Sequence, residues 1–114
     1  MDNRRDNTRT ELLRGTLDLL LLHTLQLQPL HGLAIAGRIR QVTGGTFDVQ
    51  PGSLFPALHR PEQAGWIAGE WSTTDQGRRI KSYRLTAAGR GQLATERRTW
   101  TRVAAAMAQV LESR

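Results

Sequence analysis

The chain has 114 residues, the size of one compact domain, and its hydrophobic fraction of 39% and charged fraction of 23% are those of a globular protein. This composition excludes a disordered, a collagen-like and a membrane-spanning chain. Sixteen Lys and Arg residues against ten Asp and Glu residues give a net charge of +6, which predicts a polyanionic partner.

Residues 1–10 are polar and of mixed charge, and we expect them to form a flexible N-terminal arm. They lack the apolar core of a secretion signal, and the apolar run over residues 17–27 is too short and too interrupted to cross a bilayer. The chain has no cysteine, which excludes disulfides and thiolate metal ligands and is typical of a reducing compartment. These features predict a cytoplasmic protein that does not contact a membrane.

Two helices are predicted in the first half of the chain. Residues 11–28 carry leucine nearly all round the helical wheel, which predicts a helix buried on most sides and ended by Pro29. After a short turn over residues 30–32, the apolar pattern of residues 33–42 predicts a second helix. Gly44 and Gly45 end it, because a left-handed cap has no steric cost for glycine.

A third helix is predicted to begin near Pro51, with Ser53 as its cap residue and Leu54 and Leu58 on its apolar side. The hydrophobic period then changes to alternation. Residues 66–72 and 79–85 become two short strands of a hairpin around a polar turn. Residues 86–112 form one long, alanine-rich helical pattern.

Three short helices followed by a hairpin is the order of a winged helix, whose third helix lies in the DNA major groove. The predicted fold is therefore mainly α with a β-hairpin wing. A winged helix-turn-helix domain spans residues 11–85, and a long C-terminal dimerisation helix spans residues 86–114. Residues 49–90 carry six cations and three acids, half of the net charge. Four of these cations cluster in the hairpin, where they can face phosphates: Arg78, Arg79, Lys81 and Arg84.

The long helix carries an apolar seam whose members are 7, 3, 4 and 3 residues apart, an a/d heptad pattern. They are Leu93, Trp100, Val103, Met107 and Val110. One helix cannot bury such a seam alone, so the seam pairs either with a second copy in a twofold dimer or with the core of its own chain. A dimer suits DNA reading, because recognition helices about 34 Å apart match a palindromic site.

Four segments carry a resemblance to a known family. They are LHGLAI at residues 30–35, GSLFPALHR at 52–60, GWI at 65–67 and, in the wing, RRIKSYRLTAAG at 78–89. In this order and spacing, from about Leu12 to Leu111, the chain resembles PadR-type winged-helix transcription regulators, in particular the short subfamily with one C-terminal dimerisation helix. The resemblance implies a dimeric, DNA-binding protein.

The resemblance also assigns DNA-binding residues. On the recognition helix they are Ser53, Phe55, Pro56, His59 and Arg60, and on the wing Arg78, Arg79 and Lys81. His59 and Arg60 can reach a phosphate or a base edge, and Ser53 can contact phosphate through its hydroxyl and its N–H. The wing cations hold the register on the DNA backbone. Phe55 either packs against its own domain or contacts a thymine methyl or a sugar.

Three positions depart from the family pattern. Leu33 and Phe55 stand where tyrosine is usual, so the contacts of two hydroxyls are missing. Pro61 stands where leucine is expected, inside the third helix, where it removes the N–H bond to the Ala57 carbonyl and clashes with that group. We therefore expect a kink or an early end of the helix near Arg60, which re-aims His59 and Arg60.

Trp100 is the candidate ligand-binding residue. Residues 100–103 resemble the same stretch of a multidrug regulator of the family, in which paired tryptophans sandwich flat aromatic drugs in a pore at the dimer interface. The alternative is that Trp100 only packs within the seam.

No pattern of residues indicates a catalytic or metal site. His23, His31 and His59 are too scattered to bind a metal, Gly44–Gly45 lacks the lysine of a phosphate-binding loop, and no Ser/His/Asp spacing indicates a triad. We therefore expect no enzymatic activity and no cofactor.

The sequence predicts a homodimeric, sequence-specific DNA-binding repressor that is released from a palindromic operator by a small aromatic effector. Two alternatives remain open. One is a small-molecule binding protein with incidental DNA affinity, and the other is a non-specific architectural DNA-binding protein.

Overall fold

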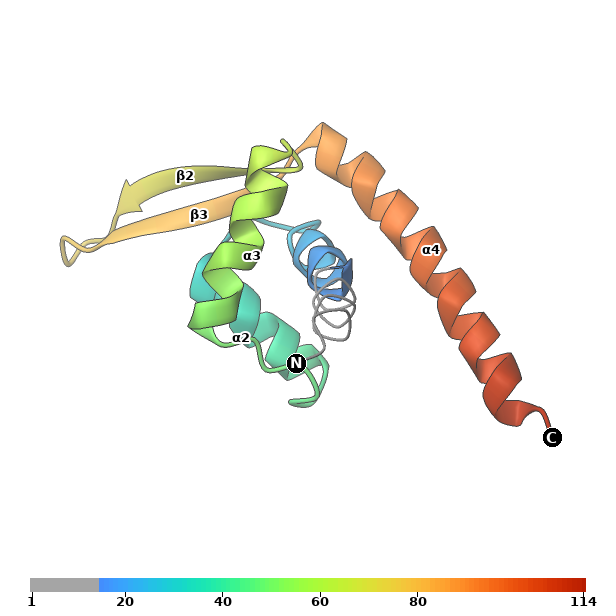
Figure 1. Ribbon diagram of the computed structural model, residues 1–114. Coiled ribbons are helices and arrows are strands. Elements are labelled where there is room, and N and C mark those ends of the chain that lie inside the picture. The colour runs from blue at the N-terminus through green and yellow to red at the C-terminus, as the bar shows by residue number, and fades with distance from the viewer. Residues whose placement is uncertain (1–14) are drawn as a thin grey trace, which may run out of the picture.

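The computed structural model describes residues 15–114, so the predicted N-terminal arm lies outside the described residues. Within residues 15–114 a first helix covers residues 15–24. It is followed by β1 (Leu30–His31), α2 (Gly32–Val42), α3 (Pro51–Gln63), β2 (Ile67–Thr73), β3 (Arg79–Leu85) and α4 (Ala87–Glu112). The β2–β3 hairpin, called the wing below, projects from one side of the helical body and α4 from the other (Figure 1). The predicted fold class, mainly α with a wing and a long C-terminal helix, is confirmed.

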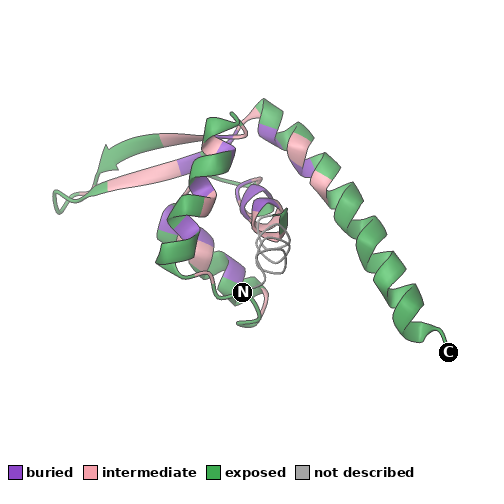
Figure 2. Ribbon diagram, in the orientation of Figure 1, coloured by how far each residue is buried: buried purple, intermediate pink, exposed green. Residues whose placement is uncertain are grey.

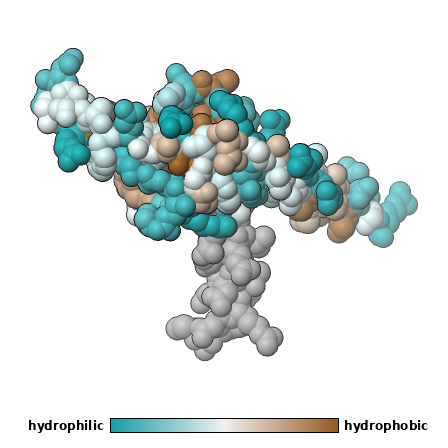
Figure 3. Space-filling model, turned by 90° about the horizontal axis from the view of Figure 1, so that it is seen from above, coloured by the Kyte–Doolittle hydropathy of each residue, from teal (hydrophilic) through white to brown (hydrophobic). Residues whose placement is uncertain are grey.

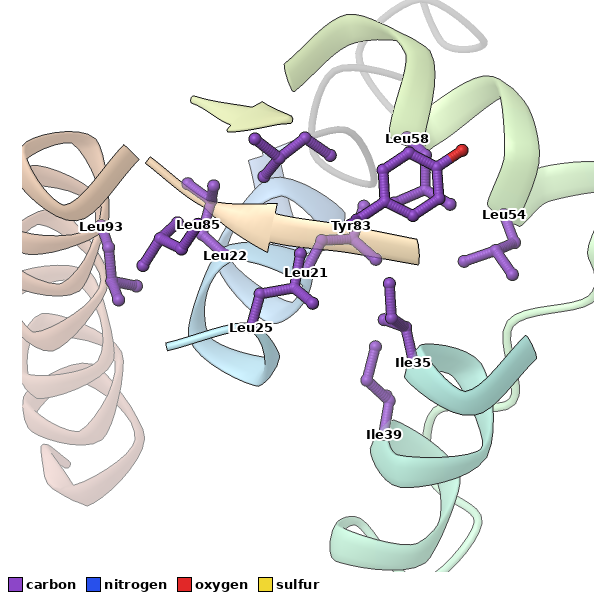
Figure 4. Close-up of a cluster of buried hydrophobic side chains, with 11 residues drawn as sticks. Leu21, Leu22, Leu25, Ile35, Ile39, Leu54, Leu58, Tyr83, Leu85 and Leu93 are labelled. Carbon is purple, nitrogen blue, oxygen red and sulfur yellow. The ribbon is translucent and has the colours of Figure 1, made fainter. Parts of the chain in front are cut away.

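One hydrophobic cluster joins these elements, and partly buried Leu30 of β1 packs against it. The first helix contributes two leucines and the turn after it one, α2 two isoleucines, α3 two leucines, the wing strands three residues and α4 one leucine (Figure 4). In chain order they are Leu21, Leu22, Leu25, Ile35, Ile39, Leu54, Leu58, Ile67, Tyr83, Leu85 and Leu93. Each is at most 7% exposed, so the short helices and the wing share a single core.

The sheet is antiparallel with the order β1-β3-β2. Residues 30–31, expected to be part of a turn, instead pair with β3, Leu30 opposite Tyr83 and His31 opposite Ser82. The wing pairs continuously from Ile67 opposite Leu85 to Thr73 opposite Arg79. Outward of Ser82 the wing is therefore a two-stranded ribbon.

The caps of α2 and α4 are side chains, whereas that of α3 is not. His31 Nδ1 accepts the Ala34 N–H at 3.4 Å, and the Thr86 hydroxyl accepts the Gly89 N–H at 3.0 Å. Gln50 is the cap residue of α3 and makes no side-chain cap bond. The prediction of Ser53 as the cap was wrong. Pro51, whose ring fixes φ at a helical value, is the first residue of the helix and lies two positions before Ser53.

The prediction of an early helix end near Arg60 was also wrong. The α3 helix continues without interruption to Gln63, and the Ala64 N–H donates to the Arg60 carbonyl at 3.0 Å. Pro61 is fully buried on the same face as Leu54 and Leu58. Burial of its apolar ring against the core offsets the hydrogen bond that the proline removes.

The start of α4 is fixed to the turn that follows α3. The Thr86 hydroxyl lies 2.6 Å from the Gly65 carbonyl oxygen and the Thr86 N–H donates to the Trp66 carbonyl at 3.0 Å. Gly89 packs on the Trp66 carbonyl so closely that a methyl group there would clash with it, and would lie 2.7 Å from a Leu85 methyl. Beyond Leu93 the helix leaves the core, and its residues 97–112 are all exposed (Figure 2).

A salt bridge joins α3 to the first helix. Asp18 is 3% exposed, and its Oδ2 lies 3.3 Å from Nη1 of Arg60, whose side chain is half exposed. A buried carboxylate is costly unless it is paired, so Arg60 supports the position of α3 on the first helix. None of the helices within residues 15–114 has both the length and the apolar character of a membrane span.

Two glycines at the start of α4 provide a matched test of this packing. We expect Gly89→Ala to lower the free energy of unfolding by roughly 1–3 kcal/mol, because its methyl group meets backbone that cannot move freely. Gly91→Ala has open space around it and should raise stability by about 0.5–1 kcal/mol through helix propensity. Urea unfolding checks both, and equal effects of the two variants would contradict the packing described.

The Asp18–Arg60 pair predicts an asymmetry between its two ends. Arg60→Ala removes a charged partner from a buried carboxylate and should cost about 1–3 kcal/mol of stability, whereas Asp18→Asn removes the buried charge itself and should cost less. Arg102→Ala, which removes an exposed arginine of α4, should stay within about 0.5 kcal/mol. Denaturant unfolding of the three variants measures this order, and an Arg60→Ala effect no larger than that of Arg102→Ala would refute it.

Candidate nucleic-acid interface

The α3 helix presents one face to the core and the other to solvent. Leu54, Leu58 and Pro61 recur at helical spacing and are buried, which fixes the rotation of the helix about its axis. The residues predicted to contact DNA all lie on the remaining, exposed surface: Ser53, Phe55, Pro56, His59 and Arg60. The structure therefore brings these five side chains together on one helix face.

The first of these residues are more constrained than the sequence indicates. The Ser53 N–H already donates to the Gln50 carbonyl at 2.9 Å, so only its hydroxyl is available to a partner. Phe55 is 48% exposed, and its Cε1 lies 2.8 Å from the position that a Cβ at Gly32 would take. One side of the ring thus packs on the start of α2 while the other faces solvent, so the packing interpretation holds for one side and the contact of the other side with DNA stays a prediction.

His59 and Arg60 differ in their partners. Arg60 is held by Asp18, as described above, so part of its hydrogen-bonding capacity is used inside the protein. His59 is exposed, and its imidazole makes no hydrogen bond or ion pair with any residue from 15 to 114. Its imidazole, which can donate and accept, is the more available polar group of the two.

The tip of the wing carries two uncompensated arginines. Arg78 follows Gly77, whose φ of +80° requires glycine, and the Arg78 N–H donates to the Thr74 hydroxyl at 3.1 Å. The Arg79 guanidinium lies over the Trp71 ring, 4.8 Å from its centroid. Neither arginine pairs with an acid in the described part of the chain. Hydrophilic side chains gather at this end of the molecule (Figure 3).

Lys81, the third predicted wing contact, is oriented differently. Its Nζ lies 3.0 Å from both Oε1 and Oε2 of Glu62, on the last turn of α3. The hydrogen bond to Glu62 raises the pKa of Lys81, so the ammonium stays charged at neutral pH. Its charge is compensated by Glu62, and its contact with DNA stays a prediction.

Three residues that contact the predicted DNA-binding residues are absent from the sequence prediction: Asp18, Glu62 and Trp71. Trp71 is 56% exposed and stands opposite Lys81 in the wing, on the same ribbon face as Arg79. Strand alternation and the short turn are the signals that place Trp71 beside Arg79. No local signal pairs Asp18 or Glu62 with its cation.

A second surface lies between the first helix, α2 and α4. It is a groove of about 430 Å³, lined by apolar side chains that include Leu20, Ile39 and Trp100. Two cations, Arg38 and Arg97, also line it, and none of its lining residues within residues 15–114 is an acid. Trp100, the candidate ligand-binding residue, is thus half exposed in an apolar groove with a basic rim.

The seam of α4 divides into two parts. Leu93 is 5% exposed in the core of its own chain (Figure 4), so its assignment to a dimer interface was wrong and the alternative of packing on its own core holds for it. The other four seam residues are between 45% and 67% exposed: Trp100, Val103, Met107 and Val110. Because the core ends at Leu93, α4 beyond it has an apolar face that residues 15–114 do not cover.

Metal ligation has no support in the described residues. Within residues 15–114 no three His, Asp or Glu side chains come close enough to hold a metal ion. Of the three histidines, His31 serves as the cap of α2.

The chain is similar to known proteins both in sequence and in fold. The family model that matches residues 21–95 is described as "Transcriptional regulator PadR-like family". A transcriptional regulator of Mycobacterium tuberculosis is 35% identical over 88 residues, which cover 77% of this chain and 78% of that protein. A PadR family regulator from Clostridium difficile is 28% identical with a TM-score of 0.72, over 83% of this chain and 97% of that one.

The structure of Bacillus subtilis PadR in complex with operator DNA has the same fold. It is 22% identical with a TM-score of 0.64, over 69% of this chain and 45% of that one. The family model covers more than half of the sequence, and the Mycobacterium tuberculosis regulator matches more than two thirds of it. The chain belongs to the PadR-like family of transcriptional regulators.

Proposed function

We propose that the chain is a homodimeric, sequence-specific DNA-binding repressor whose operator affinity is controlled by a small aromatic effector. The observation that carries the proposal is the exposed face of α3 beside a wing whose tip holds two arginines that pair with no acid among residues 15–114. The family and the operator complex of Bacillus subtilis PadR support DNA as the partner.

In this proposal α3 enters the major groove and reads base edges. His59 and the Ser53 hydroxyl supply polar contacts, and the exposed part of Phe55 contacts a thymine methyl or a sugar. Gly52 and Pro56 add no long side chains, which lets the helix approach the bases closely. Arg60 contributes through the half of its side chain that Asp18 leaves in solvent.

The wing supplies the sequence-independent part of the affinity. Arg78 and Arg79 reach phosphates of the flanking backbone, and Trp71 keeps the Arg79 guanidinium in one orientation. Binding that rests on such contacts falls steeply as salt rises, because each neutralised phosphate releases counterions.

The dimer forms through α4. The four exposed seam residues pack against their counterparts in a second copy, which buries the apolar face that one chain leaves open. The two α3 helices then read the half-sites of a palindrome about 34 Å apart.

The effector binds in the groove beside Trp100. A flat aromatic ring fits the apolar lining, and because Arg38 and Arg97 are accompanied by no acid among the lining residues of the described chain, they favour a ligand that carries a carboxylate over a cationic one. The groove lies between α4 on one side and the first helix and α2 on the other. An occupant therefore changes the angle of α4 relative to these two helices, and with it the separation of the two α3 helices in the dimer.

Selection of duplexes from a random pool by the full-length chain, at fixed salt, tests the DNA-binding proposal. We expect one palindrome, bound by two chains, with a preference of roughly 10³-fold or more over random DNA. An architectural protein would show almost no preference, and a small-molecule binding protein would enrich nothing.

Two variants separate the roles within that experiment. Arg79→Ala should weaken binding to selected and random duplexes alike and lower the salt slope by about 1, whereas His59→Ala should relax the sequence preference. Arg102→Ala removes the same charge from α4 and should change neither quantity. The assignment fails if His59→Ala behaves like Arg102→Ala.

One pair of α4 variants tests the dimer. Met107→Glu places a charge within the seam and should give a monomer by light scattering, with loss of operator binding, while Ala105→Glu places it on the opposite helix face and should stay dimeric.

A third variant tests the effector site. A flat aromatic carboxylate such as 2-naphthoate should quench the fluorescence of the wild type but not of Trp100→Phe. Equal quenching in both proteins would exclude Trp100 from the site.

A further inference from the structure

The ion pair between Lys81 and Glu62 connects the wing to α3. Lys81 belongs to β3, and Glu62 lies one residue before the end of α3. The Nζ is 3.0 Å from each carboxylate oxygen, and about a quarter of each side chain is exposed. Both carboxylate oxygens therefore point at a single ammonium at the edge of the core, where solvent screens the pair only in part.

The pair crosses strand β2 at a glycine, where no side chain stands in its way. Gly69 stands opposite Tyr83, on the same ribbon face as Lys81. A Cβ at Gly69 would clash with Lys81 Cε and lie 2.7 Å from Glu62 Oε2. Glycine at this position, which in the middle of a strand is usually unfavourable, is what lets the lysine lie across β2 and reach α3.

Two aromatic rings hold the lysine in this path. Its Nζ is 5.3 Å from the centroid of Tyr83, a core residue, and 5.8 Å from that of Trp71 further out on the wing. Lys81 is the next residue outward from Tyr83 on this face of β3. The pair thus acts where the wing becomes a two-stranded ribbon, which has little stability of its own.

We propose that Glu62 and Lys81 are positioning residues that hold the wing at a fixed angle to α3, and that Lys81 is not a phosphate contact. The proposal rests on the proposed DNA-binding function for its effect on affinity, but not for its effect on the wing itself. It replaces the role that the family resemblance implies for Lys81.

Removal of Glu62 distinguishes this role from plain electrostatics. If Glu62 were only an acid near DNA, its loss would raise the net charge, free Lys81 for a phosphate and tighten binding. If it positions the wing, its loss lets Arg78 and Arg79 leave the phosphates, and binding weakens although the protein has become more basic.

The matched control is Glu70, on the opposite face of the same ribbon, which is exposed and pairs with no cation among residues 15–114. Binding of the full-length chain to one duplex selected by the wild type is measured over a range of salt. We expect Glu62→Ala to weaken binding roughly threefold or more and Glu70→Ala to leave it equal or tighter. Lys81→Gln should weaken binding without lowering the salt slope.

Gly69→Ala tests the same geometry without changing any charge. It displaces the pair and should weaken binding as Glu62→Ala does, whereas Gly37→Ala, which has open space around it in α2, should not. Tighter binding by Glu62→Ala, or a salt slope lowered by about 1 in Lys81→Gln, would overturn the proposal.

Amide hydrogen exchange of the free protein gives a readout that needs no DNA. We expect residues 71–79 to exchange several-fold faster in Glu62→Ala and Lys81→Gln than in the wild type and in Glu70→Ala, while the protection of residues 54–58 in α3 is unchanged. Unchanged exchange in the wing would refute the positioning role. If instead the wild type selects no duplex but the wing loosens as expected, the proposed function fails and the positioning role stands.

Discussion

The packing of Leu54, Leu58 and Pro61 into the shared core is the contact on which the rest of the structure depends. These residues lie on one face of α3, so their burial leaves the face with Ser53 and His59 in solvent. The same cluster receives Tyr83 from the wing, Leu93 from α4 and three leucines from the first helix and the turn after it. A single core thus fixes the recognition helix, the wing and the start of the long helix relative to one another.

This arrangement also determines which part of α4 can respond to a ligand. Up to Leu93 the helix is fixed, because Thr86 is bonded to the turn after α3 and Gly89 packs on the Trp66 carbonyl. From Trp100 onward all of its residues are exposed with respect to residues 15–114. The groove lies across this boundary, since Trp100 lines it from the exposed part of α4 and Ile39 lines it from α2. In the proposed function, a ligand in the groove acts between the exposed part of α4 and the helices that share the core.

The order and approximate ends of the elements were predictable because their signals are local. The wing strands were expected at residues 66–72 and 79–85 and lie at Ile67–Thr73 and Arg79–Leu85, and the long helix begins at its predicted place with Thr86 as its cap. The wing strands and the long helix are indicated by the alternation of apolar and polar residues, by turn residues and by caps. All of these signals come from residues close together in the chain.

What could not be predicted depends on partners far apart in the chain. Pro61 ends a helix by local rules, but its burial in the folded chain overrides them. Leu93 belongs to the heptad pattern of α4, yet it is buried in the core of its own chain. The charge pattern assigns Arg60 and Lys81 to solvent, and their pairing with Asp18 and Glu62 exists only in the folded chain. DNA binding by the five predicted α3 residues remains a prediction, although all five lie on one exposed face.

The pairing of these two cations changes what the net charge of +6 means for DNA binding. Half of it lies in residues 49–90, but there Arg60 and Lys81 are compensated inside the protein, so within residues 15–114 the cations of the α3 and wing surface that pair with no acid are Arg78, Arg79 and Arg84. In the proposed complex, electrostatic attraction to phosphates comes mainly from the wing. The α3 face, with a histidine, a serine and an aromatic ring exposed, then contributes shape and hydrogen bonds to bases, which discriminate between sequences. Under this proposal affinity and sequence preference reside in different elements, and they act on the same stretch of DNA only while the wing keeps its angle to α3.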